Sequence, residues 1–367
     1  MKNDLYKFFK IKSLLSLILF FIFQDLSQAQ RSRPFYQGSG PQMMGDAYTA
    51  YNNNFDAVYY NPASVAKKGK PLTKIFDLEL QGSQAMFTIL PALGQLQGIT
   101  TIVANNPGSV HSLGVGYYPQ FMVKNFSVGG IVRSYTEAFV DAETGDLDLF
   151  AYTDLALSTH MGAALFGGIL KIGAGAKVIN RAEMDRRIPA AEVAAGGLSF
   201  GSEWKEGLGY GFDAGLLVQL PFSALPAWGV SVQDIGNTTL LERRVIFTGA
   251  SGTPGSPNPI RQRINTGFSL NLKHAPGIKS GLSIDVKDLV RISENYQERI
   301  NAGWELSFKS SIFFRVGVNQ GAYWTAGVGL NLAGVILEGG SYGENLFWGT
   351  GTRRDDRKFV GRYALTF

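Results

Sequence analysis

The sequence has no cysteine and only three histidines. Without thiols the chain can form neither a disulfide scaffold nor a thiolate metal site. It also lacks a Gly-rich phosphate loop and His-based metal spacing, so we predict no cofactor and no metal. The formal net charge is +5, of which residues 1–29 carry +2 through four Lys and two Asp, leaving +3 for the rest. Such a mild charge does not favour nucleic acid as a partner.

The first 29 residues have the features of an export signal. Four Lys precede an apolar core over 14–23, and the small residues Ser27 and Ala29 stand before Gln30. This pattern predicts a signal peptide over 1–29 that is cleaved before Gln30. The apolar core is too short for an ordinary spanning helix, and no Cys follows that could accept a lipid.

Alternation with a period of two residues is the main structural signal in the exported part. From Ile300 to Phe308, apolar side chains share one face of a strand, and Asn, Gly, Glu and Ser share the other. A membrane barrel needs this pattern because one side of its wall faces lipid and the other faces the lumen. The expected strands are 73–85, 110–122, 126–139, 147–161, 169–183, 206–220, 227–247, 261–273, 279–289, 298–308, 311–319, 322–332, 334–343 and 357–367.

We therefore predict an all-β fold over 73–367, a transmembrane antiparallel β-barrel of about 14 strands. A closed barrel satisfies every backbone group within lipid. The connections support the order of the strands, since short turns such as 124–125 alternate with long loops such as 184–205 and 248–260. In barrels of this kind the short turns face the periplasm and the long loops face outside.

Charged and polar side chains of both signs fall on the predicted inner face. Unpaired charge is costly away from water, so they predict ion pairs and hydrogen bonds that brace the wall and anchor a plug. Binding of a ligand carboxylate by Lys or Arg is the alternative interpretation. The residues are Lys171, Lys177, Asp213, Gln219, Asp285, Lys287, Glu305 and Arg315.

The segment 45–66 breaks the strand pattern. Small residues recur there among Asn and Asp, which favour turns because their side chains hydrogen-bond the local backbone. Pro62 fixes its own φ and moves Asn61 out of the helical region, which predicts a rigid bend. Such a segment can fill a confined space without a neighbouring strand.

This segment resembles the N-terminal hatch of the FadL family of outer-membrane transporters for hydrophobic compounds, whose relatives include PorV-type barrels. The resemblance rests on Gly45-Asp46-Ala47 and on the stretch from Asp56 to Ala63. It implies a hatch over 30–72 that folds inside the lumen of the barrel. A solvent-exposed turn rich in Asn and Gly is the alternative. The hatch motif consists of Gly45, Asp46, Asp56, Asn61, Pro62 and Ala63.

The first predicted outer loop is apolar over 86–104, where a surface loop is expected to be polar. It either packs as a cap over the barrel mouth or lies at the outer leaflet, where hydrophobic molecules first adsorb. The resemblance to FadL-type barrels implies the second role, because apolar outer elements form an access groove in that family. The residues expected at this access loop are Met86, Phe87, Ile89, Leu90 and Leu93.

The last strand ends on Phe367, with hydrophobic or aromatic residues at every second position before it. This ending resembles the signal that the outer-membrane barrel assembly machinery reads, so we expect that machinery as a partner. His111-Ser112 is the one hint of a hydrolase. Adjacent residues on a strand point to opposite faces and no Asp or Asn partner is identifiable, so we do not predict an enzyme.

Two functions remain open from the sequence. In the first, the barrel resembles FadL: it lies among lipid and lipopolysaccharide in the outer membrane of a Gram-negative bacterium and passively admits hydrophobic small molecules such as long-chain fatty acids. In the second, it resembles PorV-type barrels and holds a secreted or surface protein without transporting anything. The stretches 317–329 and 362–365 resemble those relatives.

Overall fold

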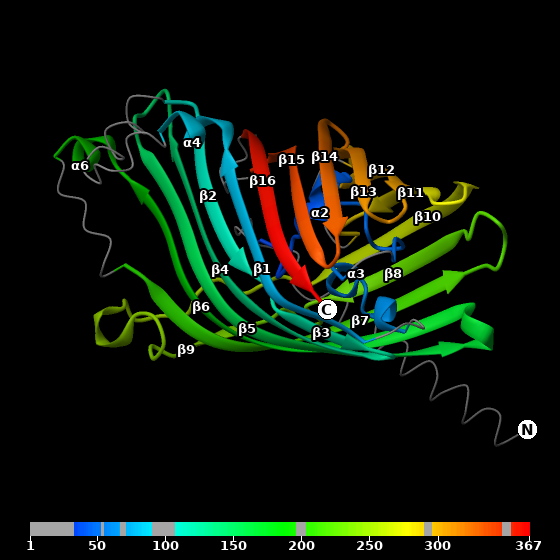
Figure 1. The fold of residues 1–367 in the computed structure, drawn as a ribbon. Helices are drawn as coiled ribbons and strands as arrows, with labels where there is room; N and C mark the ends of the chain where they lie inside the picture. Colours follow the sequence, from blue (N-terminus) through cyan, green and yellow to red (C-terminus); the bar gives the residue numbers. More distant parts are fainter. Residues whose placement is uncertain are drawn as a thin grey trace, which may run out of the picture.

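One antiparallel sheet makes up the wall of the protein and closes on itself (Figure 1). The computed structural model describes residues 33–52, 55–66, 71–89, 107–195, 203–289, 296–346 and 354–367. The sheet closes because its first strand, β1 (Leu72–Ser83), pairs with its last, β16 (Asp355–Thr366). Sixteen strands belong to the sheet, but β9 lies off the main path and β2 and β3 share one place, so fourteen strands form the closed wall.

The other strands follow one another around the wall in the order of the chain. They are β2 (Val110–Tyr117), β3 (Gln120–Val123), β4 (Phe126–Val140), β5 (Leu147–Leu165), β6 (Leu170–Ile188), β7 (Lys205–Gln219), β8 (Ala227–Gln233), β9 (Leu240–Glu242), β10 (Arg263–Ala275), β11 (Ile278–Val286), β12 (Ile300–Phe308), β13 (Ile312–Asn319), β14 (Tyr323–Leu332) and β15 (Val335–Asn345). The helices are short: α2 (Ser39–Met43), α3 (Ala57–Tyr60), η1 (Pro62–Val65), α4 (Gln84–Ile89), η3 (Phe166–Gly168), α6 (Ala190–Ala195), η4 (Gly249–Ser251) and η5 (Tyr296–Arg299).

The predicted antiparallel barrel is confirmed, and each of the fourteen predicted spans overlaps a strand of the wall. Two spans are wrong in their extent. The sequence predicts one strand over 110–122, whereas the structure has β2 and β3 there. The sequence predicts a single strand over 227–247, whereas the structure divides this stretch into β8 and β9. Asp234, Gly236 and Asn237 have positive φ angles, which an extended strand does not accommodate, so the chain turns there.

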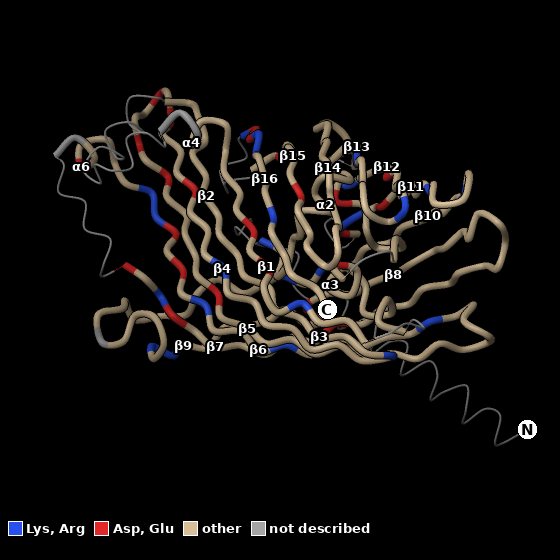
Figure 2. Tube along the Cα trace, viewed as in Figure 1, with Lys and Arg blue, Asp and Glu red and all other residues tan. Residues whose placement is uncertain are grey.

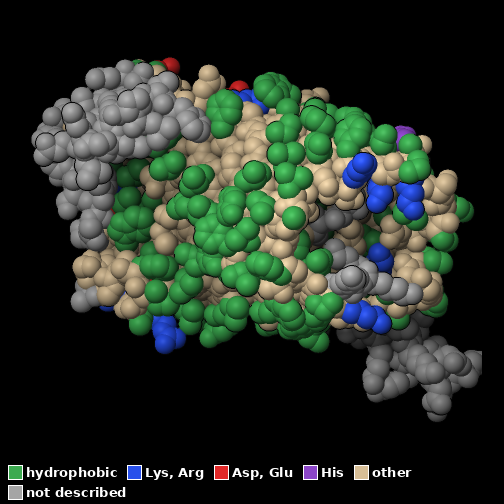
Figure 3. All heavy atoms as spheres, viewed as in Figure 1, with side chains coloured by type: hydrophobic (Ala, Val, Ile, Leu, Met, Phe, Trp, Pro, Cys, Tyr) green, Lys and Arg blue, Asp and Glu red, His purple; other side chains and the backbone are tan. Residues whose placement is uncertain are grey.

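The two faces of the wall differ as the alternation predicts. On β12, Ile300 and Trp304 are exposed on the outside, while Asn301 and Glu305 are buried on the inside. Hydrophobic side chains cover much of the outer surface seen in Figure 3. A closed wall with an apolar outside satisfies its own backbone groups, which is the condition for strands to cross a bilayer.

The two ends of the barrel differ in the length of their connections. At the short-turn end, strands are joined by tight turns such as 124–125, 276–277 and 333–334. At the long-loop end, β4, β5 and β6 extend beyond the strands on the opposite side of the barrel, and α6 lies there (Figure 1). Charged residues follow these extended strands and also gather around α2 and α3 (Figure 2). The alternation of short and long connections is the one that the sequence predicts.

The largest hydrophobic cluster joins the N-terminal part of the chain to the wall. Tyr48 and Tyr51, both fully buried, pack in one cluster with Ile131 of β4 and Ile179 of β6. The barrel interior therefore holds a hydrophobic core to which the N-terminal part of the chain and the wall both contribute side chains. The helices α2 and α3 lie on the inner side of the sheet in Figure 1.

Candidate functional site

Residues 33–52 and 55–66, which we call the inner segment, lie against the inner face of the wall. The helix α2 contacts β13, β14, β15 and β16, whereas η1 contacts β5, β6 and β7. Between them, the backbone N–H groups of Tyr48 and Thr49 donate to the Asp285 carboxylate of β11, each over 2.8 Å. The inner segment therefore contacts the wall around much of its circumference.

The bend at Asn61 and Pro62 has the shape that the sequence predicts. Asn61 is extended (φ −149°, ψ 109°), and Pro62 begins η1. The buried Asn61 Oδ1 accepts a hydrogen bond from the Ala63 N–H (3.0 Å). Its Nδ2 donates to the carbonyl oxygens of Thr49 (2.8 Å) and of Leu216 in β7 (3.1 Å). One side-chain amide thus joins two parts of the inner segment to the wall.

Glycines in the strands let the inner segment approach the wall closely. A Cβ added at Gly229 would lie 2.5 Å from the Thr49 carbonyl oxygen, and one at Gly317 would lie 2.6 Å from the Gly45 nitrogen. Both distances are far below van der Waals contact, so a larger residue would force the backbone to move. A strand glycine often marks the close approach of another backbone, and this fit accounts for part of the high glycine content.

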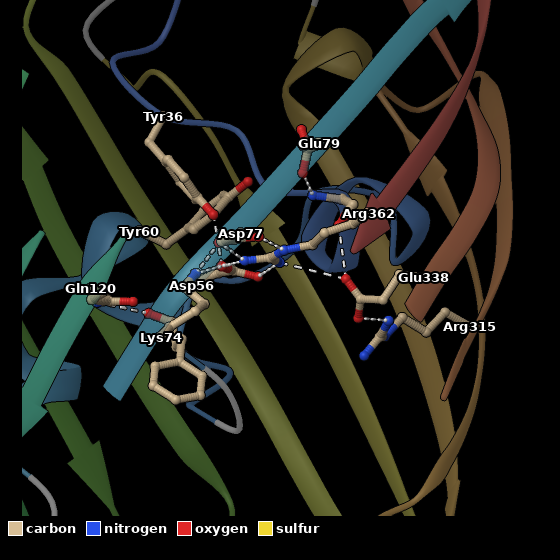
Figure 4. A network of polar contacts seen from close by, with 12 residues as sticks. Tyr36, Asp56, Tyr60, Lys74, Asp77, Glu79, Gln120, Arg315, Glu338 and Arg362 are labelled. Carbon is tan, nitrogen blue, oxygen red and sulfur yellow. Dashed lines mark hydrogen bonds and ion pairs between the residues drawn. The ribbon is translucent and has the colours of Figure 1, made fainter. Parts of the chain in front are cut away.

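A buried network of charges ties the inner segment to β1 and β16 (Figure 4). Arg362 on β16 donates to both carboxylate oxygens of Asp77 on β1, over 2.7 and 2.8 Å. The same guanidinium donates to both oxygens of Asp56 in the inner segment, over 2.9 and 3.0 Å. Lys74 forms an ion pair with Asp77 and lies 4.0 Å from Asp56. Removing one partner of such a buried pair is strongly destabilising, so Asp56 anchors the inner segment firmly.

The network continues along the wall through Glu338 on β15. Its carboxylate accepts hydrogen bonds from Arg315 of β13 (2.7 Å) and from the Ser39 hydroxyl of α2 (2.8 Å), and it lies 3.5 Å from Arg362. Arg315 also pairs with Glu305 of β12 (2.7 Å). A chain of ion pairs therefore runs from strand to strand along the inner face of the wall, from β12 to β1. It contacts the inner segment at two points, Ser39 and Asp56.

Gly45 and Asp46 form another attachment. Both have left-handed φ angles (62° and 58°), which turn the chain after α2. Asp46 forms an ion pair with Lys287 and accepts a hydrogen bond from the Tyr60 hydroxyl (2.5 Å). The Asn301 side chain of β12 donates to the Gly45 carbonyl oxygen (2.6 Å). The two halves of the predicted hatch motif are thereby brought together.

Arg33 fixes the beginning of the inner segment near the long-loop end. It forms ion pairs with Glu137 of β4 (2.6 Å) and Glu344 of β15 (2.8 Å), on separate parts of the wall. Its guanidinium also donates to the Tyr135 hydroxyl (2.9 Å). The inner segment is therefore anchored by Arg33, Asp46, Asp56 and Asn61 along its length.

The predicted access loop is described only in part. Met86, Phe87 and Ile89 lie in α4, whereas Leu90 and Leu93 lie outside the described residues. Met86 is half-buried and packs against the cluster that Val140, Leu147 and Ile188 form at the long-loop end. The C-terminal Phe367 is largely exposed at the short-turn end, and its backbone pairs with Thr73. The roles of the access loop and of Phe367 remain predictions.

The charges predicted for the inner face do form pairs there. Lys177 pairs with Asp213 (2.8 Å), Arg315 pairs with Glu305, and Lys171 donates to Gln219 (2.9 Å). Lys287 and Asp285 both bind the inner segment, as described above. The interpretation that these charges brace the wall and anchor the N-terminal part is confirmed for these contacts.

Sequence analysis missed the residues that make the central network: Lys74, Asp77, Glu338 and Arg362. Arg362 carried a signal, since it lies on the less apolar face of the last strand. Asp77 and Lys74 did not, because they are three residues apart and an ideal strand would place them on opposite faces. A bulge at Ile75 changes the register between Lys74 and Phe76, so both charges point inward.

Nothing in the described part of the chain assembles a catalytic or metal centre. The three histidines lie apart: His111 in β2, His160 in β5 against the Tyr59 ring, and His274 in β10 beside Ser280. Among the described residues, no group of three His, Asp or Glu side chains could hold a metal ion. No helix in the same residues is long and apolar enough to cross a membrane.

The fold and the inner segment together define a class: a membrane β-barrel of fourteen strands with its N-terminal part packed against the inside of the wall. Solved structures share this fold. The TodX deltaS2S3 mutant, described as a monoaromatic hydrocarbon channel, superposes with a TM-score of 0.54 at 11% identity, over 90% of this chain and 99% of that chain. The Pseudomonas putida toluene transporter TodX gives 0.51 at 10% identity, over 93% and 99%.

A Pseudomonas aeruginosa FadL homologue is also found, with a TM-score of 0.47 at 9% identity over 90% of this chain and 97% of that chain. The sequence matches no family model, and no curated protein matches it. The match to TodX confirms, at the level of the fold, the resemblance to FadL-type barrels.

Proposed function

We propose that the protein is a passive channel of the Gram-negative outer membrane for hydrophobic small molecules, long-chain fatty acids among them. The observation that carries the proposal is a closed barrel that shares, over nearly its whole length, the fold of channels described as transporting toluene and monoaromatic hydrocarbons. The polar lipopolysaccharide layer is the barrier for such substrates. A barrel that leads them past this layer needs no source of energy.

In this proposal residues 30–72 act as the hatch, and the contacts of the inner segment represent its closed state. The wall is held by pairing between strands, and those hydrogen bonds do not pass through the inner segment. Movement of the inner segment can therefore open the lumen without unfolding the barrel. The contacts of the motif residues Asp46, Asp56 and Asn61 with the wall then form in the closed state and break in the open state.

The remaining sequence predictions fit this proposal as parts of one pathway. Residues 1–29 direct export, and Phe367 presents the end of the last strand to the assembly machinery. Met86, the first residue of the predicted access loop, lies at the long-loop end, which faces outside in this orientation. Hydrophobic molecules adsorb there first and then enter the barrel.

One observation favours the second candidate, a PorV-like scaffold for a secreted or surface protein. The inner segment is held by at least four separate attachments, and its fit against strand glycines is close. A lumen that is permanently sealed in this way would serve binding at the surface rather than transport. Flux measurements separate the two candidates.

Uptake by whole cells tests the proposed channel, because small hydrophobic molecules cross plain bilayers without help and only lipopolysaccharide holds them back. The chain is expressed in a Gram-negative host whose own hydrophobic channel is deleted. Initial uptake of labelled oleate and labelled toluene is then compared with cells that carry the empty vector. Faster uptake of either compound supports the channel and identifies its substrate class; equal uptake, with folded barrel in the outer membrane, supports the scaffold.

A further inference from the structure

A loop at the long-loop end lies against the outside of the wall. We call residues 241–248 the outer-wall loop; they include the end of β9 and the residues that follow it. On β7, Tyr210 and Phe212 face outward, so Glu206 belongs to the same face. The Glu206 carboxylate accepts hydrogen bonds from the backbone N–H groups of Ile246 (2.8 Å) and Thr248 (2.9 Å). It also accepts one from the Asn180 side chain of β6 (2.7 Å), which fixes the loop to the outer face.

The outer-wall loop exposes four hydrophobic side chains. The exposed fraction is 68% for Leu241, 65% for Val245, 52% for Ile246 and 39% for Phe247. Tyr210, which is 65% exposed, extends this surface down the outside of β7. An exposed apolar surface of this kind is covered by lipid or by another molecule.

The depth of the loop follows from the length of β7. The outward-facing side chains of β7 from Val218 to Leu208 are all apolar or aromatic, and none of them is charged. Ten residue steps at about 3.3 Å each, along a strand tilted by about 40°, cover roughly 25 Å along the membrane normal. This equals the height of the apolar band of a membrane barrel. Glu206 and the outer-wall loop therefore lie at the boundary between hydrocarbon and headgroups.

The outer-wall loop also carries a cation, Arg243, two residues before Val245. Arg243 is exposed, and its side chain has no carboxylate partner in the part of the chain that the structure describes. Arg244 is held differently, since it donates to the Gly252 carbonyl oxygen (2.8 Å) and lies 3.3 Å from Glu242. The guanidinium of Arg243 is thus free to bind an anion, and arginine binds phosphate through two parallel hydrogen bonds.

We propose that the outer-wall loop is a binding site for a phosphorylated glycolipid of the outer leaflet, of the lipid A class. Acyl chains pack on Val245, Ile246 and Phe247, and a phosphate binds Arg243. The position selects a lipid over a protein, because lipid surrounds the lateral face of the wall at this depth. The hydrogen bonds from the loop backbone to Glu206 hold the loop in place, so the apolar side chains stay on the outside. The proposal places the long-loop end at the outer leaflet and does not depend on transport.

Binding of lipid A to the purified barrel in nanodiscs tests the phosphate contact. The probes are bisphosphorylated lipid A and its monophosphorylated form, and native mass spectrometry measures their affinities. We expect Arg243→Ala to weaken binding of the bisphosphorylated lipid about tenfold. The matched control is Arg187→Ala, an exposed arginine at the same end that pairs with Asp146 (2.9 Å), and it leaves the affinity unchanged. Equal affinities of the wild type and Arg243→Ala, or equal losses in both variants, would overturn the proposal.

A second measurement tests the depth of the loop and needs no bound lipid A. The chain has no native cysteine, so Ile246→Cys and Ser251→Cys each accept a single spin label. In nanodiscs, the label at 246 is expected to collide mainly with oxygen, which concentrates in lipid. The label at 251, on an exposed residue of the same connection, should collide mainly with a water-soluble nickel chelate. A label at 246 that the nickel chelate reaches as well as it reaches 251 contradicts a lipid-facing loop.

Discussion

Arg362 and Asp56 are 306 positions apart in the sequence, yet both guanidinium Nη atoms of Arg362 lie within 3.0 Å of the Asp56 carboxylate. The same arginine, on β16, also binds the Asp77 carboxylate on β1. The barrel closes where these two strands pair. One side chain thus joins the first strand, the last strand and the inner segment. Closure of the wall and attachment of the inner segment are coupled at this point.

Asp56→Asn is expected to loosen the inner segment while the barrel stays folded. The substitution keeps the size of the side chain but removes its charge, and breaking a buried ion pair costs about 3 to 5 kcal/mol. A loss of this size shifts the equilibrium between closed and open states by two orders of magnitude or more, as each 1.4 kcal/mol is about tenfold. The measurement is the swelling rate of proteoliposomes in a small polar solute, which should rise.

Asp154→Asn is the matched control for this prediction. Asp154 is equally buried but accepts its hydrogen bonds from Arg133 and Arg181 on the neighbouring strands. Its loss should lower the temperature at which the barrel unfolds and leave the swelling rate unchanged. If the two variants swell at the same rate, Asp56 has no special role in holding the inner segment.

The double variant Asn61→Ala with Pro62→Gly should also raise permeability more than it lowers barrel stability. Truncating Asn61 leaves buried backbone groups unpaired, at a cost of about 1 to 3 kcal/mol. Glycine at 62 loosens the bend by about 1 kcal/mol. Heat-modifiable mobility on gels reports the wall, and solute flux reports the lumen. Unchanged flux together with unchanged mobility would show that the motif does not gate the lumen.

Gly173→Ala should displace η1 from the wall. A Cβ added at Gly173 would lie 2.5 Å from the Ala63 nitrogen, and a backbone atom cannot move aside as a flexible side chain can. Overpacking of this kind costs about 1 to 3 kcal/mol, and we expect faster swelling of proteoliposomes. Gly339→Ala is the control, because its Cβ would meet no atom closer than 4.0 Å. Identical behaviour of the two variants contradicts the close fit.

The fold could be predicted from the sequence because its signal is local. In a strand with lipid on one side and polar groups on the other, apolar and polar residues alternate with a period of two. β12 shows this alternation from Ile300 to Phe308. The ends of strands are harder to predict from the sequence. The stretch 227–247 reads as one strand, but the positive φ angles of Asp234, Gly236 and Asn237 turn it, and those angles depend on packing.

The central network could be predicted only in part. The hatch motif placed Asp56 and Asn61 inside the barrel, but no pattern showed which wall residues they would meet. The bulge at Ile75 shifts the face of Lys74 relative to Asp77, so counting residues along β1 gives the wrong side for one of them. Contacts between the first and last strands depend on closure of the barrel and leave no local signal.

Surface labelling of intact cells tests the orientation of the barrel and its export. A tag inserted at Gly255, in the long connection after β9, should react with an impermeant label, whereas a tag at Pro276, in the turn between β10 and β11, should not. Mass spectrometry of the purified protein should find Gln30 as the first residue. Reversed labelling would place the short-turn end outside, and an intact Met1 in the membrane fraction would contradict cleavage of the predicted signal.

Locking the inner segment to the wall is the most direct test of the central claim. A Cβ added at Gly162 of β5 would lie 3.2 Å from the Cβ of Ala66, just below the roughly 3.5 to 4.5 Å between the Cβ atoms of a disulfide, and 2.8 Å from the Ile172 carbonyl oxygen. A small outward shift of β5 would relieve both contacts, and the chain has no other cysteine. The measurement is initial uptake of labelled oleate and toluene by host cells carrying Gly162→Cys with Ala66→Cys, oxidised and then reduced. A channel with a moving hatch predicts uptake at the level of empty-vector cells when oxidised and at the wild-type level when reduced. Equal uptake in both states, with the disulfide verified by mass, would contradict it.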